Sequence, residues 1–145
     1  MRRRTLKALL TLTFAVCGLT MFTQESEMTA DMRWETLICA ISAVESSGNT
    51  KAVNGHHVGI LQISPVLVDE CNRIQKGKKY SYNDRYSKEK SVEMFNVFQN
   101  YYNPEHNIEK AIRSWNGGPK YSIRKTNRYF RKVMNKFNQL MRMVE

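Results

Sequence analysis

Apolar residues recur at helical spacing in four separate stretches of this 145-residue chain, and this periodicity most restricts its fold. The first stretch carries Trp34, Leu37, Ile38 and Ile41 three or four positions apart. The others lie within residues 87–102, 108–115 and 123–144. Because side chains at this spacing share one face of an α-helix, the chain is predicted to be mainly α-helical.

Stop signals separate the predicted helices. Gly48 follows the first stretch, Pro104 the second and Pro119 the third, and Ser87 is placed to cap the second at its start. Residues 49–59 and 75–86 are polar and are expected to be loops. The apolar run 59–65 is either a short strand or a tight turn into a helix beginning near Val66.

The amount of apolar sequence fits one domain. With 41% hydrophobic residues, the chain can bury a single core. We expect a mainly α-helical single domain over residues 25–145, with at most a short strand element and a preceding signal segment.

The net charge of +10 is concentrated at the two ends of the chain. Residues 25–119 hold eleven basic and twelve acidic residues, whereas residues 120–145 hold eight basic residues and one acidic residue. An enzyme that acts on nucleic acid more often carries its basic surface around the active cleft. The charge distribution therefore argues against nucleic acid as the partner.

Residues 1–24 have the pattern of an export signal. Four basic residues precede an uncharged, mostly apolar stretch from Ala8 to Phe22, which is short for a membrane-spanning helix. We expect a cleaved signal peptide, with an uncleaved signal anchor as the alternative. The protein is accordingly expected to be exported, either periplasmic or secreted.

The metal-ligating residue types give no cluster. Loss of residues 1–24 leaves Cys39 and Cys71, which either form one disulfide or stay as separate buried thiols. His56, His57 and His106 lack the spacing of zinc ligands and are expected on loops or the surface. We expect no metal site and no cofactor.

Glu45 is the strongest candidate for chemistry. It lies four residues after Ile41 and seven after Ile38, where the apolar stripe would otherwise carry an aliphatic residue. Burial disfavours the charged carboxylate and raises its pKa, as a general acid near neutral pH requires. The alternative is a solvent-facing Glu, because the predicted helix ends within three residues.

Two further segments carry polar groups in unusual settings. Gln62 interrupts the apolar run 59–63, and its amide can donate to and accept from a sugar substituent. Trp115 and Asn116 stand at a predicted helix end before two glycines. An aromatic face can pack on a sugar ring, although each segment alone also fits an ordinary core glutamine or helix end.

Together these segments resemble the catalytic domain of soluble lytic transglycosylases and the related goose-type lysozymes. The family signature begins with Glu-Ser and a small turn, here residues 45–49. It continues with a Gly-Leu-Met-Gln-Ile-like segment, here 59–63, and ends with an Ala-Tyr-Asn-Ala-Gly-like segment, here 114–118. Trp115 replaces the usual Tyr and Ser114 the usual Ala. The resemblance covers about residues 32–119, and residues 66–106 match no motif in detail.

The resemblance implies a lysozyme-like fold and a peptidoglycan lytic transglycosylase. Glu45, as the single catalytic acid and base, would cleave the β-1,4 bond between N-acetylmuramic acid and N-acetylglucosamine and leave 1,6-anhydromuramic acid ends. The implied substrate-binding residues are Ser46, Gln62, Ile63, Trp115 and Asn116. The alternatives are a lysozyme-type hydrolase of the same bond and a non-catalytic peptidoglycan-binding module.

A second carboxylate is usual in glycoside hydrolysis. Asp69, Glu70 and Asp84 are the other acids considered for that role, and each is expected to be a solvated charge. The resemblance implies that the N-acetyl group of the substrate replaces the second carboxylate.

Residues 120–145 are predicted to form a basic amphipathic helix of about five turns. Its apolar stripe from Ile123 to Val144 is expected to pack on the domain, with the basic residues in water. The expected partners are peptidoglycan glycan strands, with electrostatic contact between this helix and anionic envelope polymers. We expect no nucleic-acid partner and a monomer.

Overall fold

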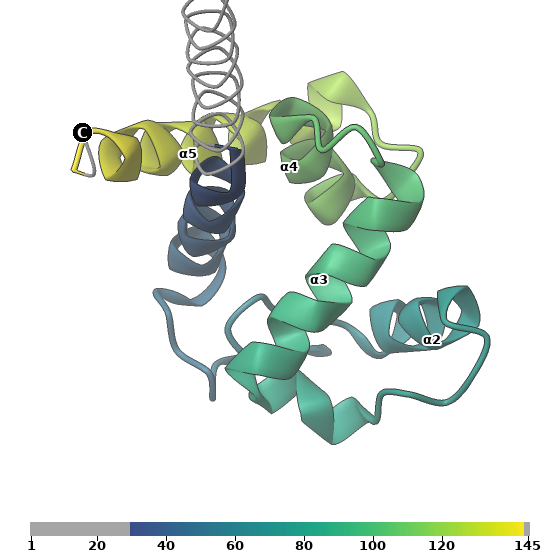
Figure 1. Cartoon of the computed structure of the whole chain (residues 1–145). Coiled ribbons are helices and arrows are strands. Elements are labelled where there is room, and N and C mark those ends of the chain that lie inside the picture. Colours follow the sequence, from purple (N-terminus) through teal and green to yellow (C-terminus); the bar gives the residue numbers. More distant parts are fainter. Residues whose placement is uncertain (1–29, 144–145) are drawn as a thin grey trace, which may run out of the picture. The chain divides into compact units, whose positions relative to one another are not determined.

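The computed structural model describes residues 30–143, so the predicted signal segment and Val144 lie outside the described residues. The chain divides after Arg33 into two units, and the fold below is that of the second unit, from Trp34 onward. This unit is mainly helical with one two-stranded sheet, as predicted (Figure 1). Within the described range, no helix is both long and apolar enough to cross a membrane.

The first helix of this unit, residues 34–46, carries Glu45 and is called the Glu45 helix. Its predicted apolar face is buried, with Leu37 and Ile41 fully inaccessible. The helix ends where the sequence indicates, because Ser47 and Gly48 adopt φ values of 54° and 80°. This left-handed geometry terminates the helix.

The strand element is a hairpin within residues 53–58, so the expectation of an irregular loop over 49–59 is wrong. β1 (Val53–Asn54) pairs antiparallel with β2 (His57–Val58). Gly55 opens the two-residue loop at φ 60°, a conformation that tight hairpin turns require. Strands of two residues are too short to show an alternating pattern. Of the two alternatives predicted for the 59–65 run, the structure shows the turn that leads into a helix. The turn contains a single bridge between Val58 and Ile63.

α2 (Pro65–Ile74) begins one residue before the predicted start, after Ser64, whose hydroxyl accepts a hydrogen bond from Leu67 N. The segment 75–86, expected to be a loop, contains a 3₁₀-helix, η1 (Tyr82–Tyr86). Asp84 is not simply solvated, because its carboxylate accepts from the Ser81 backbone N–H at 2.7 Å and so caps η1.

The remaining helices follow the predicted boundaries closely. α3 (Lys88–Tyr102) starts after Ser87, which caps it, and ends before Pro104. α4 (Ile108–Gly117) ends at the predicted glycine. α5 (Ile123–Met141) packs against α4.

The inner face of α5 is buried as predicted, with Val133 fully inaccessible and Phe137 5% exposed. Arg113 of α4 donates to Thr126 Oγ1 at 3.1 Å and lies over the Phe130 ring at 4.1 Å. Ile123 is 65% exposed, so its predicted place in the apolar stripe is wrong. It occupies the first helical position, before the chain reaches the packed surface.

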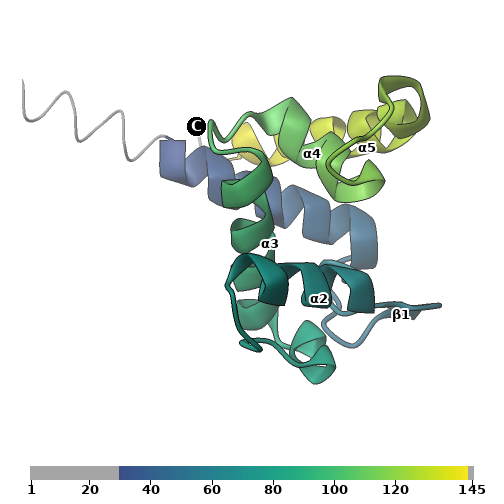
Figure 2. The same cartoon turned by 90° about the vertical axis from the view of Figure 1, so that its right-hand side faces the viewer.

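Within this unit the Glu45 helix lies between α4 and α5 on one side and α2 with the hairpin on the other (Figure 2).

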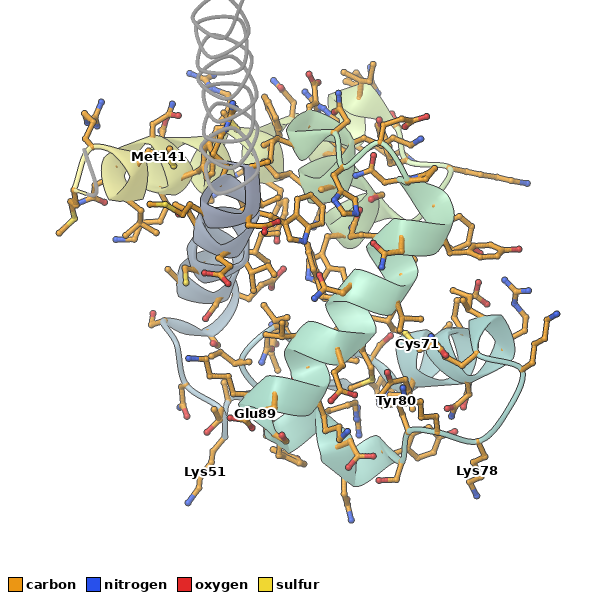
Figure 3. All side chains as sticks on the ribbon, in the orientation of Figure 1. Lys51, Cys71, Lys78, Tyr80, Glu89 and Met141 are labelled. Carbon is orange, nitrogen blue, oxygen red and sulfur yellow. The ribbon has the colours of Figure 1, made fainter. Side chains whose placement is uncertain are left out.

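Cys71 of α2 is buried close to Tyr80 (Figure 3), and burial raises the pKa of its thiol to about 12. Both Cys71 and Cys39 are free, and Cys39 is exposed. The disulfide is therefore not formed, and the alternative of two buried thiols holds only for Cys71.

Candidate active site

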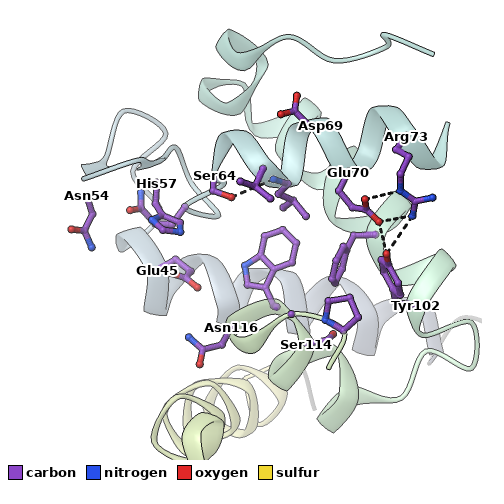
Figure 4. Close-up of a pocket in the computed structure, with 17 residues that line it drawn as sticks. Glu45, Asn54, His57, Ser64, Asp69, Glu70, Arg73, Tyr102, Ser114 and Asn116 are labelled. Atoms are coloured by element: carbon purple, nitrogen blue, oxygen red, sulfur yellow. Dashed lines mark hydrogen bonds and ion pairs between the residues drawn. The ribbon is translucent and has the colours of Figure 1, made fainter. Parts of the chain in front are cut away.

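A cavity of about 780 Å³ brings together segments that are far apart in the sequence. The end of the Glu45 helix, the hairpin, α2, the end of α3 and the end of α4 all line it (Figure 4). Four of the six predicted site residues are among its walls: Glu45, Gln62, Trp115 and Asn116. The fold thus brings the three sequence motifs to one concave surface.

Glu45 is half-buried one residue before the end of its helix and lines the cavity. Burial raises the pKa of its carboxyl group, and this effect outweighs an opposing hydrogen bond from Tyr129. The Tyr129 hydroxyl donates to Glu45 Oε1 at 2.6 Å. Oε2 accepts no hydrogen bond within the described part of the chain, so it is available to a substrate or a proton.

Tyr129 belongs to α5, and the sequence analysis did not identify it. Burial, followed by the neighbouring Glu45 carboxylate, raises the pKa of its hydroxyl well above the usual value, so the group stays a hydrogen-bond donor. A signal was present, because Tyr129 lies four residues before buried Val133 and therefore on the inner face of the predicted helix. The partner across 84 positions could not be predicted from local pattern.

Gln62 combines a structural role with exposure to the cavity. The Gln62 backbone adopts φ 50°, and the side-chain amide nitrogen donates to Gly59 O at 2.9 Å and Ala52 O at 3.3 Å. These bonds fix the side chain on the turn that follows β2. Among the described residues its amide oxygen has no hydrogen-bond donor, which leaves an acceptor at the cavity wall.

Ser46 and Ile63 do not line the cavity. The Ser46 hydroxyl donates to Ile60 O at 2.8 Å and so ties the end of the Glu45 helix to the turn before Gln62. Ile63 is fully inaccessible in the core. Direct substrate contact by these two residues stays a prediction, and their observed contacts position Glu45 and Gln62.

Trp115 and Asn116 occupy the C-terminal end of α4. The Trp115 ring is half-buried against Phe95 and Phe98, with ring centroids 4.9 and 6.0 Å away, and also faces the cavity. Asn116 is exposed at the cavity rim. A rigid aromatic wall beside a free amide is a surface suited to a sugar ring and its polar substituents.

The end of the cavity away from Glu45 carries an ion pair (Figure 4). Arg73 donates to both oxygens of Glu70, at 2.6 and 2.8 Å, and Tyr102 also donates to Glu70. These partners, Arg73 first, lower the pKa of Glu70 to about 2. The neighbouring Asp69 accepts from the Tyr82 hydroxyl at 3.1 Å. The expectation of a solvated charge is therefore wrong for Glu70, which is paired with Arg73 at the cavity wall, whereas Asp69 is exposed to solvent as predicted.

Metal ligands do not converge within the described residues, where no group of three His, Cys, Asp or Glu side chains could hold an ion. His57 lines the cavity from β2, and His56 and His106 are exposed outside the helices and strands, as predicted. The residues that line the cavity supply carboxyl, hydroxyl, amide, imidazole and guanidinium groups.

Comparison with known proteins gives one family. Residues 22–143 match the model of the transglycosylase SLT domain, which covers most of the chain and all of the described cavity. No curated protein and no solved structure matches the chain significantly. The match includes Glu45, the turn with Gln62, and the end of α4. This chain belongs to the transglycosylase SLT domain family.

Proposed function

We propose that this protein is a peptidoglycan lytic transglycosylase in which Glu45 is the single catalytic acid and base. The observation that carries the proposal is the half-buried Glu45 carboxyl group, whose pKa is raised by burial at the wall of a cavity of about 780 Å³. A carboxyl group of this kind retains a proton closer to neutral pH and can deliver it to a leaving group.

The proposed reaction uses Glu45 twice. The protonated carboxyl donates its proton to the glycosidic oxygen as the bond from C1 of N-acetylmuramic acid to that oxygen breaks. The N-acetyl group of the same sugar assists at C1. Ionised Glu45 then removes the proton of the muramyl 6-hydroxyl, whose oxygen bonds to C1 and closes the 1,6-anhydro ring. The carboxyl ends protonated, and no water is consumed.

Tyr129 supports both steps by holding Glu45. Its hydrogen bond fixes Oε1 and stabilises the ionised form, which is needed in the second step. Oε2 is left to face the reacting oxygen atoms. Trp115 is proposed to support a sugar ring, with Asn116 and the Gln62 amide oxygen binding its substituents.

The state and place of the other two cavity acids, Glu70 and Asp69, support a single-acid mechanism. The partners of Glu70, Arg73 and Tyr102, lower its pKa to about 2, so the group is ionised near neutral pH and has no proton to give. Asp69 and Glu70 lie on α2, away from Glu45 in the cavity (Figure 4). Neither is placed beside Glu45 as the second carboxylate of a lysozyme-type hydrolase, which favours the transglycosylase over that alternative.

The chemical form of the product tests the proposal. Purified peptidoglycan digested with the protein should release fragments that end in 1,6-anhydromuramic acid, which are 18 Da lighter than their hydrated counterparts because one water is not added. Mass spectrometry separates the two. Reducing ends alone would make the protein a hydrolase, and intact peptidoglycan would indicate a non-catalytic binding module.

The substrate requires a location outside the cytoplasm. We therefore propose that residues 1–24 direct export, with the domain at 25–145 acting in the envelope or outside the cell. N-terminal sequencing of the exported protein should find a start near residues 18–25, whereas an intact Met1 would indicate a retained signal anchor.

A further inference from the structure

The outer face of α5 carries a continuous row of positive charge. We call it the basic stripe, and it consists of Arg124, Lys125, Arg128, Arg131, Lys132 and Lys136. Over the 100° step of an α-helix these side chains fall within an arc of about 140°, and at 1.5 Å per residue they extend about 18 Å along the axis. The segment 120–143 contains no acidic residue to neutralise them.

The stripe is held away from the core by the packing of α5. Thr126, Val133 and Phe137 are buried on the opposite face. All six basic residues are exposed except Lys136, which is intermediate. None of them forms an ion pair with a described residue. Their charge is therefore free to act on a partner.

One edge of the stripe adjoins the candidate active site. Lys125 and Lys132 lie four residues before and three residues after Tyr129, so they flank it on the helix surface. Tyr129 is the residue that contacts Glu45. A long polymer bound at Glu45 can thus extend across α5 and meet the stripe.

We propose that the basic stripe is a second binding site for peptidoglycan itself, where it takes the carboxylates of the stem peptides on the insoluble polymer. This inference rests on the proposed function, because that function supplies the polymer. The stripe would hold the enzyme on its substrate between cleavage events. Long-range attraction of this kind is screened over about 10 Å at 0.1 M salt.

The observations favour this partner over a membrane surface. A helix that lies in a membrane inserts an apolar face. The apolar face of α5 is already buried against the domain, so only charge is presented. The stem-peptide carboxylates need no second polymer, since they belong to the chain whose sugars would occupy the cavity.

The test compares two variants with the same change in charge. In the first, Arg124, Arg128, Arg131 and Lys132 are replaced by Gln. In the control, Gln replaces four exposed lysines outside α5: Lys51, Lys76, Lys78 and Lys88. Lys51 and Lys78 lie at the opposite end of the molecule from α5 (Figure 3). Both sets are placed in a Glu45→Gln background, so that binding to insoluble peptidoglycan is measured without cleavage.

The stripe variant should bind insoluble peptidoglycan about tenfold or more weakly than the control at 0.1 M salt, since four exposed pairs are lost. The affinity of the control should fall with salt, and that of the stripe variant should fall less. Amidation of the wall carboxylates should weaken binding of the control as much as loss of the stripe does. Equal binding by the two variants would overturn the proposal.

Two further results would assign the stripe elsewhere and also overturn the proposal. One is binding that survives amidation but is lost when wall-attached phosphate polymers are removed. The other is stripe-dependent binding to anionic phospholipid vesicles that is tighter than binding to the wall.

Cleavage assays keep this proposal separate from the proposed function. With Glu45 present, the stripe variant should cut a short soluble glycan at the wild-type rate and insoluble wall more slowly. If wild-type protein cuts neither substrate, the proposed function fails, while the binding comparison still tests the stripe.

Discussion

At the scale of single residues, Glu45 shows what local sequence can and cannot predict. Its place in an apolar helical stripe predicts a partly buried carboxyl group with a raised pKa, and the structure confirms that direction. The opposing hydrogen bond comes from Tyr129, 84 positions away. That contact depends on how α5 packs, and a local pattern contains no information about it.

The raised pKa of Glu45 makes a prediction about stability. Below its unfolded pKa of 4.5, the Glu45 carboxyl group is protonated in the folded and the unfolded protein, and its burial does not lower stability through ionisation. As the pH rises through the folded pKa, the folded protein must ionise a half-buried group and loses stability. Glu45→Gln removes that cost. Its melting temperature should exceed that of the wild type near pH 7, with the difference shrinking toward pH 4. An equal difference at both pH values would contradict this account of burial.

Tyr129→Phe keeps the ring and removes the donor to Glu45. The ionised carboxylate then loses a stabilising partner, so the pKa of Glu45 should rise further. The limb of the pH–rate profile that reports Glu45 ionisation should move to higher pH. We also expect kcat to fall about tenfold, the effect of losing a hydrogen bond to a charged group. An unmoved limb in a folded variant would show that Tyr129 does not act through Glu45.

At the scale of elements, periodicity predicted the long helices and missed the short elements. The boundaries of α3 and α4 follow from the Ser87 cap and from stop residues that are visible in the sequence. The hairpin and η1 depend on contacts between distant segments. Arg85 of η1, for example, donates to His56 O at 3.1 Å and Ile63 O at 3.2 Å. No stretch of five residues encodes such contacts by itself.

Gly59 tests this coupling between the motif turn and η1. It adopts φ 80°, and a Cβ atom there would lie 1.8 Å from Arg85 O. Gly55 is a matched control, because it has φ 60° and open space around a Cβ atom. Both Ala variants should lose about 1–2 kcal/mol from left-handed strain, and Gly59→Ala about 1–3 kcal/mol more from the clash. Equal unfolding free energies in urea would argue against the close approach.

The packing of α5 on the domain can be tested with two of its apolar residues that differ in exposure. Phe137 is 5% exposed, so Phe137→Ala should lower the free energy of unfolding by about 3–5 kcal/mol. Ile123 is 65% exposed, so Ile123→Ala should change it by less than about 0.5 kcal/mol. Similar effects of the two substitutions in chemical denaturation would show that α5 does not pack through this face.

At the scale of the whole molecule, the motifs converge on one cavity while its far end is assembled from unmatched sequence. Glu45, Gln62 and Trp115 were identifiable because each is a polar or aromatic residue in a marked local setting. Glu70 and Arg73 were not, since their side chains are indistinguishable in sequence from an ordinary exposed i,i+3 pair. Their place at the cavity follows only from the packing of α2 against α3.

The central claim is that Glu45 alone supplies the acid and the base for cleavage of peptidoglycan. The direct measurement is the rate at which soluble fragments are released from purified peptidoglycan by the wild type, Glu45→Gln and Glu35→Gln. Glu35 is an exposed residue of the same helix and serves as the matched control. The wild type and Glu35→Gln should release fragments at the same rate, and Glu45→Gln should be slower by about 10²–10⁴-fold while remaining folded. A folded Glu45→Gln protein that cuts within about tenfold of the wild-type rate would contradict the account.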